Sequence, residues 1–533
     1  DLQVLAVDMN VLYEKKMYCT LDIARLIDSD RLAYSLDSLA KDWLKQEIKQ
    51  YELALKPYLV KNADYGWIPI HVLGEYGCQD VLTNRQLWKY EQANVPEESK
   101  QLVETSSQVT ACLGRIERVG VRVNPAQVKV AELKAMIEMG DAQAKCHEIL
   151  GYTIEPHNNA DCFDTLCNNL GFPILSYNES GNPSFDKEAL KAYKALPGAP
   201  IELLDQMLLY RKWHTFNGLF AKPFSSLQID GLLHSKYKQT VRTGRMACSL
   251  PNMQQCMAEA KMLVIPGKDE VIITSDYSQI EFRVIVHYIQ DAACIAAYNA
   301  DPFTDFHTWV ALMCEIHRKP AKTVNFLMGY GGGQNKLVTQ LMQIPELVGG
   351  ILEGLNRNMS INAEKKAELF NMLAKNRGME VYNKYHETLP GLKITSRQAM
   401  NRVYERGYCV NKYGRRRTLP TQFAYRAFNT ICQGTAADLM KERLVALELW
   451  LMQFHPEVVL IGVVHDEVVL RAPKHYATDQ RFLDSISYIL EDIQVLLRIP
   501  IRTTVGVSDK SWFEASKSAE PRLFDRLAFR LAL

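Results

Sequence analysis

The chain has 533 residues, of which 47% are hydrophobic and 23% charged, and its formal net charge is +1. At ~150 residues a domain, this length predicts about three or four domains and enough apolar surface for a large core. No apolar run approaches the ~18 residues of a membrane span, and the first residues lack the basic and apolar regions of a signal peptide. The balanced charge leaves nucleic-acid binding open, because basic residues can gather in one groove. The run RVYERGYCVNKYGRRR (402–417) is such a concentration, with a solvated loop as the alternative.

The 12 cysteines are scattered and form no C-x-x-C pair. This argues against a zinc ribbon or a redox dithiol. So many unpatterned thiols predict a reducing, cytoplasmic location.

Residues 1–97 combine apolar strand-like runs with helical segments. Residues 98–150 have the period of two long amphipathic helices, interrupted by Gly and Pro. Residues 151–200 are rich in turn signals, and a helical pattern returns over 201–220.

Strand signals begin at 227–240, where LQIDGLLHSKYKQT predicts a hairpin around a D-G turn. The branched run at 270–276 predicts a strand, and 279–291 has a helical period. Most of 290–450 also reads as helix. VVLIGVVHDEVVLRA (458–472) predicts two short strands joined at an acidic turn. Strand sets so far apart are expected to join one sheet, with a helical domain inserted between them.

Asp466 and Glu467 lie inside this last apolar run. A buried carboxylate without a partner costs several kcal/mol, so a pair or a metal is expected, unless the turn is simply exposed to water. Asp276 closes another apolar strand, and Glu281 follows it. If Asp276 and Asp466 meet on adjacent strands, they form the kind of oxygen-ligand pair that Mg²⁺ chemistry uses.

Four residues of RKPAKTVNFLMGYGGG are spaced by four: Arg318, Lys322, Phe326 and Tyr330. On a helix they share a face, with two cations followed by two aromatic rings. The cations suit a triphosphate and the rings suit a base. The alternative is an ordinary amphipathic helix with its rings in the core.

Three segments in order, DYSQIEFR, R-x3-K-x3-F-x3-YG and HDE, resemble motifs A, B and C of family A DNA polymerases, the group of bacterial DNA polymerase I and many phage replicases. Further segments that resemble this family are GRIERVGVRVNP (114–125), TGRMACSLPNMQQC (243–256), GRRRTLP (414–420) and FNTICQGTAADLMK (428–441). The resemblance covers roughly residues 100–515.

The resemblance implies a multidomain α/β (α+β) fold shaped like a right hand, with an antiparallel palm sheet and helical fingers and thumb. The expected domains are a partial, ribonuclease H-like 3′→5′ exonuclease domain (1–97), a thumb (98–235), a palm (236–283 and 427–533) and fingers (284–426).

By resemblance, Asp276, Asp466 and the backbone carbonyl of Tyr277 bind two Mg²⁺ ions, for which Mn²⁺ can substitute. Glu467 is an auxiliary carboxylate near the primer end, and Lys322 takes part in catalysis. The residues implied for the incoming dNTP are Arg318, Lys322, Phe326, Tyr330, Glu281, His307 and Gln279. Those implied for primer-template DNA are Arg245, Asn252, Gln255, Gln433, His465 and Asn429. Glu281 is expected to exclude a 2′ hydroxyl and so to select deoxynucleotides.

Tyr76 and Asp80 resemble the Tyr-x-x-x-Asp motif of the family's proofreading domain, and Asp1 sits where its second motif ends. The first motif is expected to lie before residue 1. We therefore expect no proofreading by this chain, and a purely structural platform is the alternative role for residues 1–97.

Some positions depart from the family's pattern. Leu327 follows the motif B aromatic residue where glycine is usual, and Gln255 stands where asparagine is common. Tyr425 occupies a position that is often arginine, and Arg426 follows it.

The sequence thus predicts a DNA-dependent DNA polymerase, monomeric, without a membrane association and located in the cytoplasm of a phage host or bacterium. Three alternatives remain open at this point. They are a single-subunit RNA polymerase, a catalytically silent DNA-binding relic, and a nuclease. Glu281 and Phe326 argue against the first, and the metal-binding aspartates argue against the second. The missing first exonuclease motif argues against the third.

Overall fold

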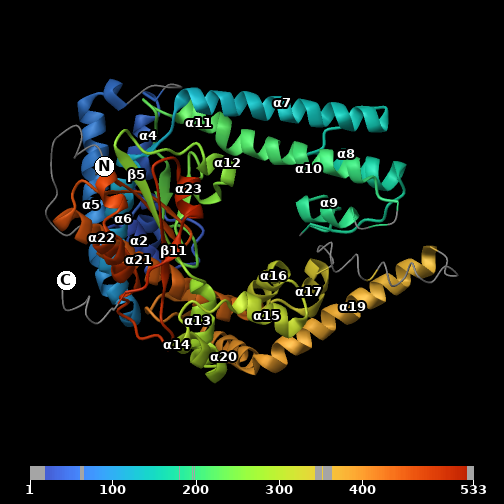
Figure 1. Ribbon diagram of the computed structural model, residues 1–533. Helices are drawn as coiled ribbons and strands as arrows, with labels where there is room; N and C mark the ends of the chain where they lie inside the picture. Colours follow the sequence, from blue (N-terminus) through green and yellow to red (C-terminus); the bar gives the residue numbers. More distant parts are fainter. Residues whose placement is uncertain are drawn as a thin grey trace.

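The computed structural model describes residues 18–59, 65–178, 180–194, 196, 198–329, 331–341, 351 and 363–524 (Figure 1). Two residues named above, Asp1 and Tyr330, lie outside this set.

A five-stranded antiparallel sheet forms the centre of the molecule. Its strands, in spatial order, are β11 (Glu520–Pro521), β10 (Thr503–Ser508), β5 (Glu270–Tyr277), β9 (Glu467–Pro473) and β8 (Val459–Val464). The central strand therefore comes from a part of the chain about two hundred residues before its neighbours. This confirms that the two predicted strand sets share one sheet.

Both faces of the central strand are covered. Consecutive residues of a strand point to opposite faces, yet all of 271–275 is buried. Helix α23 (Trp512–Lys517) packs on β5 and β10, whereas α6 (Lys100–Val119) and α21 (Ala427–Phe454) pack on β8. The Tyr277 hydroxyl donates to the carbonyl of Leu490 in α22 (Gln480–Glu491), at 2.7 Å. The sheet is thus held between helices, and only its strand ends are open for a site.

A pair of long helices forms one arm of the molecule. These are α7 (Pro125–Leu150) and α10 (Ile201–Phe216), which pack together. The Asn124 side chain begins α7 by accepting from the amides of Ala126 and Gln127, as its sequence predicts. The shorter helices on this arm are α8 (Asn159–Phe163), α9 (Lys187–Tyr193) and α11 (Lys222–Leu227).

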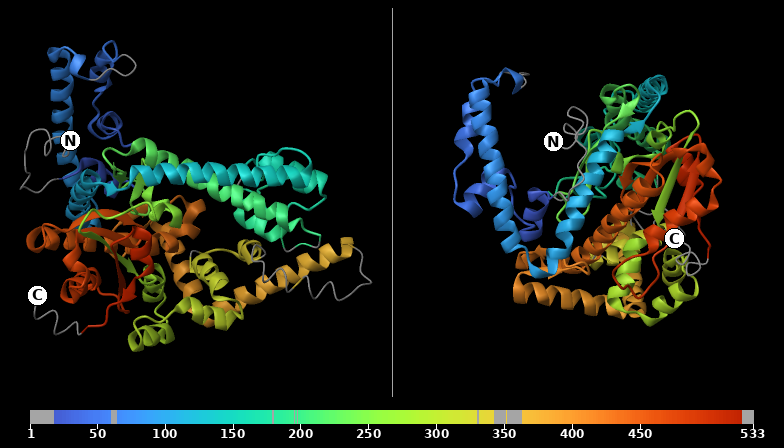
Figure 2. Two further views of the ribbon diagram at one scale, coloured as in Figure 1. Left: turned by 45° about the horizontal axis from the view of Figure 1, so that its top comes forward. Right: turned by 90° about the vertical axis from the view of Figure 1, so that its left-hand side faces the viewer.

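The chain between β5 and β8 is largely helical, as expected. Its helices are α13 (Ile280–Ile289), α14 (Ala292–Ala300), α15 (Phe306–Cys314), α16 (Arg318–Gly329), α17 (Gln334–Leu341), α19 (Ala363–Thr388), α20 (Pro390–Arg406) and α21, with a small hairpin of β6 (Tyr408–Val410) and β7 (Arg416–Thr418). Helix α19 forms a second arm, and both arms project to the same side of the sheet-containing body (Figures 1 and 2). The outline is that of the predicted hand.

One prediction about strands is wrong. The D-G turn at Asp230–Gly231 is present, with a single bridge between Ile229 and Leu232. Its flanks do not form a hairpin, because β2 (Leu232–Leu233) pairs with β1 (Val121–Arg122) and β3 (Lys236–Lys238) pairs with β4 (Ala247–Ser249). These strands therefore pair with strands outside the predicted hairpin and not with the other flank of the turn.

The strands expected within residues 1–97 are tested only in part, because residues 1–17 and 60–64 lie outside the described residues. The described residues between 18 and 97 contain no strand. Their helices are α2 (Thr20–Ile27), α3 (Leu36–Leu39), α4 (Lys49–Leu55) and α5 (Ile70–Asn94). Ala24, Leu39 and Leu87 form a small core between these helices.

No helix in the described part of the chain is long and apolar enough to cross a membrane.

Candidate active site

The acidic run lies in the tight turn of the hairpin that joins β8 to β9. Val464 of β8 pairs with Glu467 of β9, so His465 and Asp466 are the two residues of the turn. His465 has φ of 53°, the left-handed conformation that such two-residue turns require. The backbone amide of Tyr277 donates to the Asp466 carbonyl at 3.2 Å.

Asp276 lies beside this turn. It is paired with Glu467 in the β5–β9 register and with Thr504 on its other side. Asp276 and Asp466 line one cavity of about 760 Å³. The structure therefore brings together the two strand-end aspartates, which confirms the expectation that they meet on adjacent strands.

This cavity brings acidic side chains close together, and the pKa values of two of them are raised. Loss of hydration, followed by the charges of Asp466 and Glu467, raises the pKa of Asp276 to about 7. Burial also raises the pKa of Asp466, while Arg245, His465 and Lys322 oppose that rise. A divalent cation would relieve the repulsion between the two carboxylates.

The carboxylates of this cavity can hold Mg²⁺ if other ligands complete its coordination. No group of three or more His, Cys, Asp or Glu side chains is placed to hold a metal among the residues that the structure describes. Mg²⁺ is commonly held by one or two carboxylates together with waters and substrate phosphates. Asp276 and Asp466 are therefore sufficient protein ligands if a phosphate-bearing substrate supplies the rest.

Glu467 is held by three side chains, although it lies next to the site. Its Oε2 is 2.7 Å from Lys261 Nζ, and its Oε1 accepts from Trp512 Nε1 (3.2 Å) and Ser516 Oγ (2.6 Å). Its side chain is 9% exposed. Both carboxylate oxygens are thus engaged by the protein.

Helix α16 carries the predicted cations. Lys322 Nζ lies 5.9 Å from the centre of the Phe326 ring, so the expected spacing does place them on one face. The Lys322 charge opposes the rise in pKa at both Asp276 and Asp466, so this face is directed toward the carboxylates. Arg318 is bound elsewhere, with Nε 2.5 Å from Asp305 Oδ2.

Gln279 and His307 also meet at Asp305. Gln279 Nε2 donates to Asp305 Oδ1 at 3.3 Å, and the amide of His307 donates to the same oxygen. The His307 side chain is buried, its Nδ1 is 2.9 Å from Asn325 Nδ2, and burial lowers its pKa to about 4. A contact between His307 and a triphosphate stays a prediction.

Glu281 lies in a small pocket next to Asp466. Its carboxylate is buried and forms an ion pair with Arg245. Burial, with a contribution from the charge of Asp466, raises the pKa of Glu281 to about 8. His465 lines the same pocket. Two predicted DNA contacts, Arg245 and His465, thus adjoin the predicted sugar gate.

The other predicted DNA contacts lie on two elements. Asn252 accepts from the amide of Gln254 at 3.2 Å and starts the short turn that ends at Gln255. Asn429 and Gln433 lie one turn apart on α21. Asn429 lines a cavity of about 790 Å³ together with Phe326, which joins the α16 and α21 surfaces.

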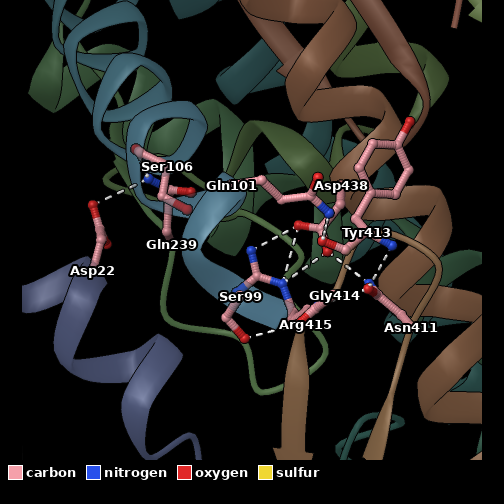
Figure 3. A network of polar contacts seen from close by, with 10 residues as sticks. All are labelled: Asp22, Ser99, Gln101, Ser106, Gln239, Asn411, Tyr413, Gly414, Arg415 and Asp438. Atoms are coloured by element: carbon pink, nitrogen blue, oxygen red, sulfur yellow. Dashed lines mark hydrogen bonds and ion pairs between the residues drawn. The ribbon is translucent and has the colours of Figure 1, made fainter. Parts of the chain in front are cut away.

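A buried polar network fixes α21 (Figure 3). Arg415 Nη2 is 2.7 Å from Asp438 Oδ1, and Asn411 Nδ2 donates to Asp438 Oδ2 at 2.7 Å. The turn between β6 and β7 also accepts from Ser99 Oγ, through the Gly414 carbonyl at 2.7 Å. These contacts therefore connect the start of α6, the β6–β7 hairpin and α21.

The N-terminal part is joined to the same region. Gln239 Nε2 donates to Asp22 Oδ2 at 3.1 Å and to the Ser106 carbonyl at 2.7 Å (Figure 3). Tyr76 and Asp80, one turn apart on α5, interact: desolvation and then Asp80 raise the pKa of Tyr76 to about 12.

Sequence reasoning missed several residues that build this site. Lys261, Trp512 and Asp305 belong to no recognised motif. Their partners lie 206, 45 and 13 residues away. No local sequence pattern indicates contacts between residues so far apart. Asp305, in DPFTDFH, does have one local signal, because aspartate is typical of the residue that begins a helix.

Comparison with known proteins supplies the family. The family model for DNA polymerase family A matches residues 126–514. The chain is 25% identical to DNA polymerase DpoZ of Salmonella phage PMBT28, over 94% of this chain and 84% of that protein. It is 26% identical to the thermostable DNA polymerase I of Thermus thermophilus, over 81% of this chain and 49% of that protein.

The chain therefore spans most of the phage relative and about half the length of the bacterial one. Among solved structures, it is similar to the POL domain of Pol1 from M. smegmatis, in complex with DNA primer-template and dNTP. The TM-score is 0.74 at 20% identity, covering 93% of this chain and 82% of the other. At this identity, the likeness concerns the fold.

Proposed function

The chain belongs to DNA polymerase family A, a family of DNA-directed DNA polymerases, and we propose that it adds dNTPs to a primer 3′ end along a DNA template by two-metal nucleotidyl transfer. The observation that carries this proposal is that Asp276, at the end of β5, and Asp466, in the turn between β8 and β9, line one cavity. The phage and bacterial relatives are DNA polymerases, and the solved relative holds primer-template and dNTP, which supports the same partners here.

In the proposed reaction, Asp276, Asp466 and the backbone carbonyl of Tyr277 hold two Mg²⁺ ions, with Mn²⁺ as a substitute. When bound, these ions activate the primer 3′ hydroxyl and neutralise charge at the α-phosphate. Lys322 and Arg318 hold the triphosphate and offset the charge of the transition state. Arg318 must first leave Asp305, so nucleotide binding is coupled to a movement of α16 toward the palm.

Substrate selection falls to the pocket beside Asp466. Glu281 closes the space at the sugar 2′ position, Phe326 packs by the sugar, and Tyr330 is assigned to the templating position by resemblance alone. Arg245, bound to Glu281, links this gate to the primer duplex. The remaining duplex contacts are Asn252, Gln255, Asn429, Gln433 and His465, which test pair geometry at the minor groove.

We assign 98–235 to the thumb, 236–283 and 427–533 to the palm and 284–426 to the fingers. Residues 1–97 are proposed to be an exonuclease-like platform that does not proofread, attached through contacts such as Gln239–Asp22. All twelve cysteines are free thiols, which supports a reducing cytoplasm. The protein is proposed to act as a monomer.

Primer extension tests this function. With a primed DNA template and Mg²⁺, dNTPs should extend the primer, whereas rNTPs should not. Glu281→Ala removes the gate, so ribonucleotide incorporation relative to deoxynucleotide should rise about 10- to 100-fold. Glu514→Ala, in α23, removes a carboxylate that does not line the Glu281 pocket; it is the control and should keep the parent's selectivity. Preferential use of rNTPs by the parent chain would instead support the RNA polymerase alternative.

A further inference from the structure

The third carboxylate of the site, Glu467, has a dedicated cation. Lys261 ends the short helix α12 (Ala258–Lys261), and its Nζ lies 2.7 Å from Glu467 Oε2. The Lys261 side chain is 18% exposed, and its ammonium sits 4.2 Å from the centre of the buried Trp512 ring. Such a partly desolvated ion pair and cation–π contact fix the ammonium in place.

The same cluster ties three elements together. Trp512 and Ser516, both on α23, donate to Glu467 Oε1. The backbone amide of Trp512 donates to the Val264 carbonyl, just after α12, at 2.9 Å. Helices α12 and α23 therefore clamp the first residue of β9, the residue paired with Asp276 and next to Asp466.

Without Lys261, the cavity would present three carboxylates of like charge. Glu467 would then add its charge to that of Asp276 and Asp466, and its side chain would be free to turn toward a bound cation. More negative charge favours metal binding, but an additional ligand disturbs the geometry that transfer needs.

We propose that Lys261 is a positioning residue: it neutralises Glu467 and keeps it out of the metal site, so that Asp276 and Asp466 alone bind the catalytic ions. This inference rests on the proposed two-metal function of the same site. It assigns a role to a lysine outside the three polymerase motifs.

Direct metal binding tests the proposal apart from activity. Binding of Mn²⁺ to the 533-residue chain without DNA is measured from the electron paramagnetic resonance signal of the free ion. Lys261→Met should tighten Mn²⁺ binding about three- to tenfold, because one positive charge near the ions is lost. Glu467→Gln should weaken it by a similar factor, because Lys261 is then uncompensated. The double variant should return close to the parent value.

The kinetics of primer extension provide the second part of the test. Both single variants should lower the kcat of primer extension and leave KM for dNTP within about twofold, since neither residue contacts the nucleotide. Lys261→Arg keeps the charge and should bind Mn²⁺ like the parent. Lys517→Met, which removes an exposed lysine from α23, is the matched control and should change neither quantity.

The two single variants shifting Mn²⁺ affinity in the same direction, or not at all, would overturn the role of Lys261. If Lys261→Met does not fold, Lys261→Gln, which also removes the charge, takes its place in the same measurement. A parent chain that extends primers while its variants show no shift would refute only this inference. A parent chain that neither extends primers nor binds Mn²⁺ would refute the proposed function as well.

Discussion

At the residue scale, Asp276 and Asp466 occupy adjacent strand ends and share one cavity. The motifs that contain them could be recognised from the sequence because each carboxylate lies within a few residues of a buried, apolar strand. The partner of Glu467 was not recognisable. Lys261 is 206 residues away, and its neighbours in sequence give no sign that it ends in an ion pair.

The raised pKa of Asp276 predicts how the metal requirement depends on pH. With its pKa at about 7, Asp276 is protonated below neutrality in the absence of metal, and protons then compete with Mg²⁺. The half-saturating Mg²⁺ concentration for single-nucleotide incorporation should be nearly constant above pH 8 and rise by up to about tenfold per pH unit below 7. A value that stays constant from pH 8 to pH 6 would contradict this coupling.

Glu91, on α5, predicts a pH-dependent stability. It is fully buried, its oxygens have no hydrogen-bond partner among the residues that the structure describes, and burial raises its pKa to about 8 from 4.5. The folded state therefore binds its proton more tightly than the unfolded state, and stability falls as pH rises from about 4.5 to 8. Glu91→Gln should stabilise α5 by about 1–3 kcal/mol at pH 8 and by little at pH 5.

Hydrogen exchange of the α5 amides measures this effect. Glu75→Gln, at an exposed position of the same helix, is the control and should leave exchange unchanged at both pH values. Equal protection of the Glu91→Gln variant and the parent at pH 8 would show that Glu91 has a partner in solution.

At the element scale, α21 depends on the buried Arg415–Asp438 pair. Removing one partner of such a pair leaves a buried charge uncompensated. Arg415→Met should therefore lower the free energy of unfolding by about 3 kcal/mol or more, measured by urea denaturation. Lys412→Met, at an exposed position in the same hairpin, should cost under about 0.5 kcal/mol. Equal losses for the two variants would contradict a structural role for the pair.

Elements with strong periodicity were predictable from sequence. The helix α6 and the strands β5, β8 and β9 follow their apolar patterns closely, whereas α7 forms where a helix was expected but leaves Val130, Met136 and Ile137 exposed. The hairpin expected at Asp230–Gly231 was wrong, because each flank pairs with a strand from elsewhere in the chain. In the described residues of 18–97, apolar clusters serve helix packing, which short runs cannot distinguish from strands.

At the scale of the whole molecule, the discontinuous sheet was foreseen from two distant strand sets, and the two helical arms extend from it to one side. Family membership follows from motifs spread along most of the chain. The polar network in Figure 3 was not foreseen, because it unites residues from five separate segments of the chain. It connects the N-terminal helix α2, the start of α6, the β6–β7 hairpin and α21.

The most direct test is single-turnover incorporation of one dNTP on a primed DNA template by Asp466→Asn, with primer-template affinity measured in parallel. The account predicts a loss of at least about 1,000-fold in rate, with affinity for the DNA changed by less than about threefold. Asp509→Asn, at an exposed aspartate after β10, should keep the parent's rate. An Asp466→Asn enzyme that incorporates the nucleotide at the parent's rate would contradict the assignment of the strand-end aspartates as the catalytic centre.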